Sequence, residues 1–123
     1  MPIVVVERKA LLGADTKAKV AAEFTEILKE VIKSPDDLIS VVFHDLPADS
    51  TFRGGVPTDE ALIFLHVRLG RSDEVLLRLL KGISDVWTRI TGESEDAVEI
   101  LLSQYPAKFV MRGGVRLPEP PAI

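Results

Sequence analysis

Apolar residues recur at the spacing of one helix face in two stretches of the chain. The first face consists of Val20, Phe24, Ile27, Leu28 and Val31, and the second of Leu76, Leu79, Leu80, Ile83, Trp87 and Ile90. Asp15-Thr16 and Ser72 are typical helix starts, while Ser34-Pro35 and Gly92 are typical ends. The pattern therefore predicts two amphipathic helices, one opening at Asp15 and the other capped by Ser72.

Short apolar runs flank each predicted helix and read as strands. They cover Ile3–Arg8 and Leu38–Leu46 around the first helix, and Ala61–Val67 and Ala97–Leu102 around the second. A helical crossover makes the two strands that it joins parallel, with a right-handed connection. We therefore predict an α/β fold (α+β by some schemes), in which tandem β-α-β units form a four-stranded sheet with both helices on one face.

A repeated motif indicates that the two units are copies of one another. Arg53-Gly54-Gly55-Val56 recurs as Arg112-Gly113-Gly114-Val115, and Pro47-Ala48 recurs as Pro106-Ala107 at the same interval. We predict one domain, residues 1–123, made of two repeats at about 2–56 and 61–115, each ending in a tight Gly-Gly turn. The strands are almost continuously apolar, which is typical of burial on both faces. Since the helices cover one face, we expect partner subunits on the other.

Composition narrows the class of protein. A formal net charge of −4 over 123 residues gives no basic field for nucleic acid, and the absence of cysteine excludes disulfides and thiolate chemistry. His44 and His66, the two histidines, fall on different predicted strands without metal-ligand spacing, so we expect neither a metal nor another cofactor. No signal peptide and no run of about 20 apolar residues is present. We expect a cytoplasmic protein with no membrane partner.

Pro2 follows the start methionine and opens the first strand. If Met1 is removed, the Pro2 nitrogen becomes a secondary amine at the rim of an apolar sheet. An α-amino group has a pKa of about 8, which burial and nearby cations lower, and a free amine can act as a general base. The alternative is a strand-start proline without a chemical role, and with Met1 retained its nitrogen is a non-basic amide.

With the duplicated units and Pro2, the run Gly70-Arg71-Ser72-Asp73-Glu74 makes the chain resemble the tautomerase superfamily, specifically 4-oxalocrotonate tautomerase-like proteins. A longer match is to the fused, trimeric subgroup typified by cis-3-chloroacrylic acid dehalogenase. That match takes in Phe43–Pro47, Phe52-x-Gly54-Gly55-Val56, Ile63-Phe64, Arg68-x-x-Arg71-Ser72 and Pro106-Ala107. The resemblance implies the trimeric β-α-β tautomerase fold and a homotrimer.

The resemblance also implies roles for individual residues. Pro2 would be the general base or acid, and Arg68 and Arg71 would bind the carboxylate of a small substrate, for which the guanidinium fork is well matched. The alternative for these arginines is a solvated strand end and helix start. His66 shares a strand face with Arg68, so it is a candidate for the pocket wall.

The chain departs from the dehalogenase pattern at three positions. Thr25–Lys29 lacks the histidine of the first helix, and Leu101 stands at the tyrosine position of the last strand, with Tyr105 several residues late. Arg112 falls near the position of the water-activating glutamate. Phe52, Leu101 and Arg112 complete our list of possible pocket residues.

These departures favour keto-enol tautomerisation of a small 2-keto or unsaturated carboxylic acid, because that reaction needs the fewest groups. The alternatives are a cis-3-haloacrylate dehalogenase, hydratase or decarboxylase homologue, and a trimer that binds carboxylates without catalysis. A third alternative is an unrelated regulator with a ferredoxin-like fold. It would have the same number of strands and helices but would lack parallel pairing within each unit.

Overall fold

The computed structural model describes residues 1–9 and 12–123. The first half holds β1 (Ile3–Lys9), α1 (Ala14–Ile32), the 3-10 turn η1 (Asp36–Leu38), β2 (Ser40–Leu46), and a hairpin of β3 (Phe52–Arg53) and β4 (Val56–Pro57). The second holds β5 (Ala61–Arg68), α2 (Asp73–Thr91), η2 (Glu95–Ala97), β6 (Val98–Tyr105), η3 (Ala107–Phe109), and a hairpin of β7 (Met111–Arg112) and β8 (Val115–Arg116). The order of elements therefore recurs, while the repeat bounds 2–56 and 61–115 stay a prediction.

Both predicted helices form, and local chemistry explains their ends. The Ser72 hydroxyl accepts a hydrogen bond from the Val75 amide at 3.3 Å, which satisfies one of the free donors at the start of α2. Gly92 ends α2 in the left-handed conformation, with φ +74°, and Lys33 ends α1 in the same way. The predicted start at Asp15 is one residue late, because α1 begins at Ala14.

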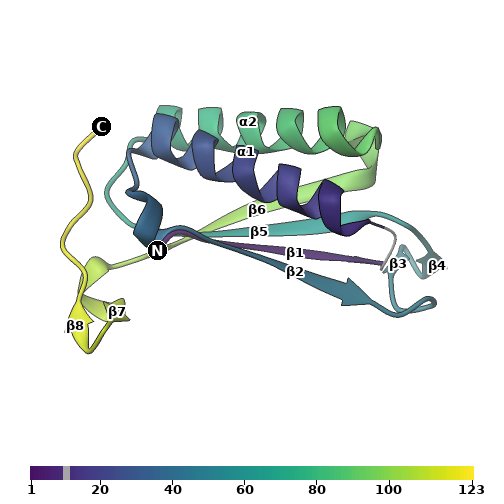
Figure 1. Cartoon of the computed structure of the whole chain (residues 1–123), viewed down its shortest axis with the longest axis horizontal. Coiled ribbons are helices and arrows are strands. Elements are labelled where there is room, and N and C mark those ends of the chain that lie inside the picture. The colour runs from purple at the N-terminus through teal and green to yellow at the C-terminus, as the bar shows by residue number, and fades with distance from the viewer. Residues whose placement is uncertain (10–11) are drawn as a thin grey trace.

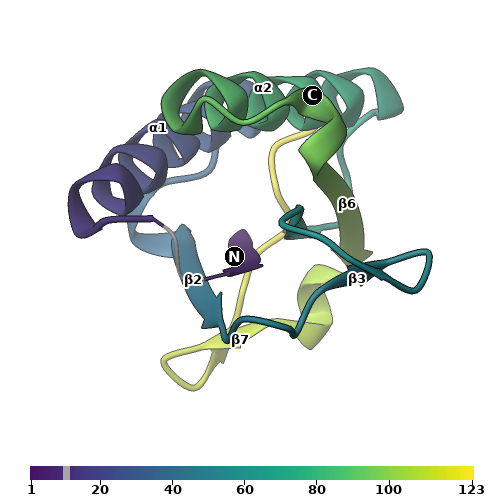
Figure 2. The same ribbon diagram turned by 90° about the vertical axis from the view of Figure 1, so that its right-hand side faces the viewer.

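The core lies between the two helices and one face of the sheet (Figures 1 and 2). Its largest fully buried side chains include Trp87, Phe24 and Leu28 from the helices and Ile63 and Leu65 from β5. Every position of the two predicted helix faces belongs to this core or packs against it. Burial of this apolar face, rather than helix propensity alone, stabilises the helices.

The four main strands pair in the order β2-β1-β5-β6. β1 is parallel to β2 and β5 is parallel to β6, as the crossover connections predict, while the two central strands are antiparallel. The result is a mixed sheet with two helices on one face, which confirms the predicted fold class in its α+β form. Because β1 and β5 run in opposite directions, the start of β1 lies beside the end of β5.

The predicted starts of two strands are wrong. Leu38 and Ala97 belong to the 3-10 turns η1 and η2 rather than to the strands that follow. The second of these turns is capped by the Ser94 hydroxyl, which accepts a hydrogen bond from the Asp96 amide. At its other end β6 continues past Leu102 as far as Tyr105. The predicted Gly-Gly turns are correct: all four glycines have positive φ and close the two hairpins.

No helix of the described residues covers the second face of the sheet, which we call the outer face (Figure 2). Ile3, Val42 and Leu101 lie on it and are 37%, 48% and 39% exposed. Figure 1 shows the N-terminus, the β7–β8 hairpin and the C-terminal tail at one end of the molecule, and the β3–β4 hairpin at the other. Within residues 1–9 and 12–123, neither helix is long and apolar enough to cross a membrane.

Candidate active site

The antiparallel pairing of the central strands brings the N-terminus to Arg68. Ile3 pairs with His66, so the same register, continued toward the chain start, sets Pro2 opposite Val67 and Met1 opposite Arg68. Pro2 is buried, and its carbonyl accepts a hydrogen bond from the Ser40 amide at 3.1 Å. Met1 is present in the structure, and the Pro2 nitrogen is therefore part of a peptide bond.

The terminal amine occupies a desolvated, positively charged position. Burial lowers the pKa of the Met1 amine below its ordinary value of 8.0, and the charges of Arg68 and Arg112 lower it further. Asp37 acts in the opposite direction. An amine at this end of β1 is thus biased toward its uncharged, basic form.

Arg68 is buried beneath the C-terminal tail. Its side chain is on the outer face of β5, and the residue is only 3% exposed. One terminal nitrogen, Nη1, donates to the Pro118 carbonyl at 2.6 Å, while Nε is buried with no hydrogen-bond partner among the described residues. Burial lowers the pKa of Arg68, and Glu119 opposes that effect. Arg68 therefore keeps donor capacity that the fold does not use.

Arg71 makes a different set of contacts. Its Nη1 donates to the Arg68 carbonyl at 3.0 Å and its Nη2 donates to the Ile32 carbonyl at the end of α1 at 3.1 Å. Burial, followed by the charge of Arg68, lowers the pKa of Arg71 to about 10, so the side chain stays cationic at neutral pH. The two predicted arginines lie close together, but the terminal nitrogens of Arg71 already bind backbone oxygens.

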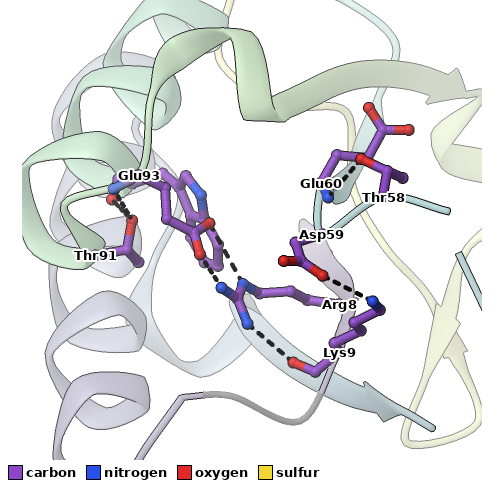
Figure 3. Close-up of polar contacts among 8 residues, drawn as sticks. Arg8, Lys9, Thr58, Asp59, Glu60, Thr91 and Glu93 are labelled. Carbon is purple, nitrogen blue, oxygen red and sulfur yellow. Dashed lines mark hydrogen bonds and ion pairs between the residues drawn. The ribbon is translucent and has the colours of Figure 1, made fainter. Parts of the chain in front are cut away.

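At the opposite end of the sheet, another arginine makes comparable contacts (Figure 3). Arg8, near the end of β1, forms an ion pair with Glu93, which follows α2, and also donates to the Lys9 carbonyl at 3.0 Å. Lys9 pairs with Asp59 beside it at 2.7 Å. Arg8 in β1 and Arg71 after β5 thus each contact the segment where one helix ends, Arg8 through Glu93 beyond α2 and Arg71 through the Ile32 carbonyl of α1.

His66 and Tyr105 form a hydrogen-bonded pair on the outer face. His66 Nδ1 lies 2.9 Å from the Tyr105 hydroxyl, and Tyr105 stands opposite Arg68 in the β5–β6 register. Tyr105 was not predicted as a site residue, because it stands several residues after the expected tyrosine position and beyond the predicted strand end at Leu102. The signal was available: Leu101, Ser103 and Tyr105 alternate along one strand and so share a face.

The remaining predicted residues are spread over the chain. Leu101 stands opposite Phe64 on the outer face, and Arg112 in β7 acts on the terminal amine, as its effect on the pKa of that group shows. Phe52 is 56% exposed in the β3–β4 hairpin, at the other end of the molecule from the N-terminus (Figure 1). Within one chain, Phe52 does not join the other candidates.

Other parts of the described structure offer less chemistry. No three His, Cys, Asp or Glu side chains of residues 1–9 and 12–123 lie together as a metal site would require. A shallow groove runs between α1 and α2, on the helix layer rather than at the N-terminus. Its walls are Thr16, Lys19, Ala22, Glu23, Arg89 and Ile90.

The family model described as Tautomerase enzyme matches residues 2–60, and no curated protein matches the chain. A solved member of the cis-3-chloroacrylic acid dehalogenase (cis-CaaD) family is 25% identical, with a TM-score of 0.93 over 97% of this chain and 85% of the other.

Two further structures share the fold. A wild-type fused 4-OT, solved as an asymmetric trimer, is 19% identical with a TM-score of 0.88, over 94% of this chain and 95% of the other. Pt0534, solved after inactivation by 2-oxo-3-pentynoate, is 24% identical with a TM-score of 0.87, over 94% and 96%. Together with the family model, these structures confirm the resemblance read from the sequence: the chain is similar to the tautomerase superfamily, with fused 4-OT and cis-CaaD proteins as its structural neighbours.

Proposed function

We propose that the mature chain begins at Pro2 and uses that nitrogen to move a proton on a small 2-keto or unsaturated carboxylic acid. The observation that carries the proposal is the antiparallel β1–β5 register, which brings the N-terminus to Arg68. Removal of Met1 would leave a secondary amine one residue further into the sheet, at a position that is already buried. The lowered pKa of the present amine supports a basic nitrogen there.

The proposed reaction needs a base and a carboxylate site. The lone pair of Pro2 takes a proton from the carbon next to the carbonyl; the C–H electrons form a C=C bond, and the carbonyl electron pair moves to oxygen. Returning the proton to that oxygen completes the enol, and the reverse path forms the ketone. Arg68 would bind the substrate carboxylate through Nη2, the terminal nitrogen that has no hydrogen-bond partner among the described residues. Arg71 would support Arg68 through its carbonyl and add a second positive charge.

Partner subunits would complete this site. Apolar side chains remain exposed on the outer face and in both hairpins, and a fused 4-OT of the same fold is a trimer. We propose a homotrimer in which the β3–β4 hairpin of a neighbouring chain brings Phe52 to the Pro2 end. Leu101 and Arg112 would line the same pocket from within the chain.

A hydrolytic dehalogenase is a weaker candidate, because Arg112 is a cation where a water-activating acid is needed. A carboxylate-binding trimer without catalysis is the second candidate. It is favoured by one observation, the presence of Met1, which leaves the Pro2 nitrogen in a non-basic peptide bond.

The test replaces Pro2 with alanine and follows ketonisation of an arylpyruvate enol, after intact-mass measurement of both proteins. Loss of a positioned general base costs about 100-fold or more in rate. We expect that loss for Pro2→Ala, and a wild-type mass that corresponds to a chain starting at Pro2. Equal turnover, or a wild-type chain that keeps Met1, would reject the mechanism. The carboxylate-binding trimer without catalysis would then be the better proposal.

A further inference from the structure

We infer that the Tyr105 hydroxyl, held by His66, hydrogen-bonds the substrate oxygen on which negative charge develops. This inference deepens the proposed function and rests on it. Tyr105 is here the substrate-contacting group, and His66 is a positioning residue that acts through it.

The position of the pair supports this role. Tyr105 is the last residue of β6 and stands opposite Arg68, while His66 stands opposite Ile3 across the β1–β5 pair. Both side chains lie on the outer face, between the N-terminal end of β1 and the tail that covers Arg68. A carboxylate bound at Arg68 would therefore place the adjacent carbonyl close to the phenol.

The geometry of the pair indicates that His66 orients the Tyr105 hydroxyl and does not merely cover it. Tyr105 is 37% exposed, so water could satisfy its hydroxyl without help from the protein. Instead its oxygen lies 2.9 Å from His66 Nδ1, with ring centroids 5.7 Å apart and planes tilted by 47°. Holding two side chains in one arrangement costs conformational entropy. What this arrangement gains is a phenol aimed in a fixed direction.

The proposed role requires one arrangement of the hydrogens in this pair. If His66 Nδ1 carries a hydrogen and donates it to the phenol oxygen, the phenol hydrogen remains free for a ligand. Proton removal next to a carbonyl develops negative charge on the carbonyl oxygen, and a preorganised donor at that oxygen stabilises the transition state more than the ground state. Arg68 engages the carboxylate and Pro2 moves the proton. The reaction also needs a hydrogen-bond donor to the carbonyl oxygen, and Tyr105 would supply it.

Kinetics test the assignment. Tyr105→Phe removes only the hydroxyl, and we expect kcat on the arylpyruvate enol to fall about 100-fold with KM changed less than about threefold, as for loss of one oxyanion donor. His66→Ala should lower kcat in the same direction, and His66→Gln, which retains an N–H donor, should recover part of it. The matched control is His44→Gln, because His44 pairs with Glu7 near the other end of β1 and should not change kcat. Wild-type kcat in Tyr105→Phe, with Pro2→Ala inactive, would overturn this inference and leave the proposed function intact.

A binding measurement gives an answer that does not depend on turnover. Tyr105 is the only tyrosine of the chain, so replacing tyrosine with 3-fluorotyrosine yields a single fluorine signal. Benzoylformate is a suitable probe, since it carries the carboxylate and carbonyl but no hydrogen that can be removed beside the carbonyl. We expect the fluorine signal to shift on saturation with benzoylformate, and the shift to disappear in Arg68→Ala. A signal that stays fixed at saturation, or absence of benzoylformate binding, would overturn the assignment.

Discussion

At the residue scale, Arg68 and Arg71 resemble each other in sequence but differ in what they already bind. Both arginines leave Nε without a partner among the described residues, but Arg71 uses both terminal nitrogens on backbone carbonyls of β5 and α1, whereas Arg68 uses Nη1 alone. The difference separates an arginine with one unengaged terminal nitrogen from one whose terminal nitrogens both support the fold.

We therefore expect Arg68→Ala to affect mainly substrate binding and Arg71→Ala to affect mainly stability. Arg68→Ala should raise KM for the carboxylate substrate about tenfold or more and, since it removes one charge-assisted hydrogen bond, should lower the unfolding free energy by only about half as much as Arg71→Ala. Arg71→Ala removes two charge-assisted hydrogen bonds and should lower the unfolding free energy by about 3 kcal/mol. Urea titration followed by Trp87 fluorescence measures the stability, and Arg78→Ala, an exposed arginine of α2, is the control. Equal effects of both variants on KM, with equal stability, would show a symmetric clamp instead.

The pH profile of kcat/KM reports the terminal amine. Burial, Arg68 and Arg112 all lower the pKa of the Met1 amine below 8.0, and we expect the same groups to lower the pKa of the Pro2 amine once Met1 is removed. We expect kcat/KM of the mature enzyme to rise with pH and to level off at an inflection below 8.0. Arg112→Ala removes a repelling charge, which should raise the pKa and move the inflection to higher pH. An inflection above pH 8.0, or one that does not move in Arg112→Ala, would contradict the assigned base.

At the scale of elements, the antiparallel centre of the sheet defines both ends of the molecule. One end carries the N-terminus and Arg68, and the other carries the ion pair between buried Arg8 and half-buried Glu93 (Figure 3). Because Arg8 is 6% exposed, loss of one partner leaves an uncompensated buried charge, which costs about 3–5 kcal/mol.

Glu93→Ala should thus lower the unfolding free energy by about 3 kcal/mol or more. The double variant Arg8→Met/Glu93→Leu should lose less than Glu93→Ala alone, since no charge remains buried. Asp59→Asn, which breaks the exposed pair with Lys9, should change stability by less than about 1 kcal/mol. A double variant that loses as much as the sum of its single variants would show that the pair does not act as one unit.

Much of the fold could be predicted from the sequence because its signals are local. Helix faces, the Ser72 cap and the Gly-Gly turns depend on neighbours within a few residues, and parallel pairing follows from the helical crossover. The antiparallel β1–β5 pairing joins the two halves and has no local signal. The meeting of the N-terminus with Arg68 was therefore reached only through the resemblance.

Two features of the candidate site could not be predicted for related reasons. Ser103 and Gln104 interrupt the apolar run of β6, which placed the predicted strand end before Tyr105 and hid its contact with His66. The bond from Arg71 to the Ile32 carbonyl joins residues far apart in sequence, so only the folded chain shows that this arginine is engaged.

At the scale of the whole molecule, large apolar side chains are exposed on the outer face and in the two hairpins. Phe109, Met111 and Val115 are 75%, 65% and 67% exposed around the β7–β8 hairpin, and Val42 is 48% exposed on β2. Exposed apolar surface of this kind marks an interaction site.

We expect light scattering to give the mass of a trimer, and Val42→Glu on the outer face to give smaller species. If a neighbour supplies Phe52, then mixing inactive Pro2→Ala chains with weakly active Phe52→Ala chains, under conditions that exchange subunits, should restore activity above that of either alone. Mixed trimers would contain sites with an intact Pro2 and an intact Phe52 from different chains. A monomeric wild type, or no gain on mixing, would contradict the shared site.

Covalent labelling tests the central claim most directly. Pt0534, a neighbour in fold, has been solved after inactivation by 2-oxo-3-pentynoate, whose carboxylate suits Arg68 and whose alkyne can accept the lone pair of a free amine. The account predicts one adduct per chain, mapped by mass spectrometry to the nitrogen of an N-terminal Pro2, with activity lost in proportion and labelling slowed in Arg68→Ala. A chain that retains Met1, or an adduct on any other residue with Pro2 unmodified, would contradict it.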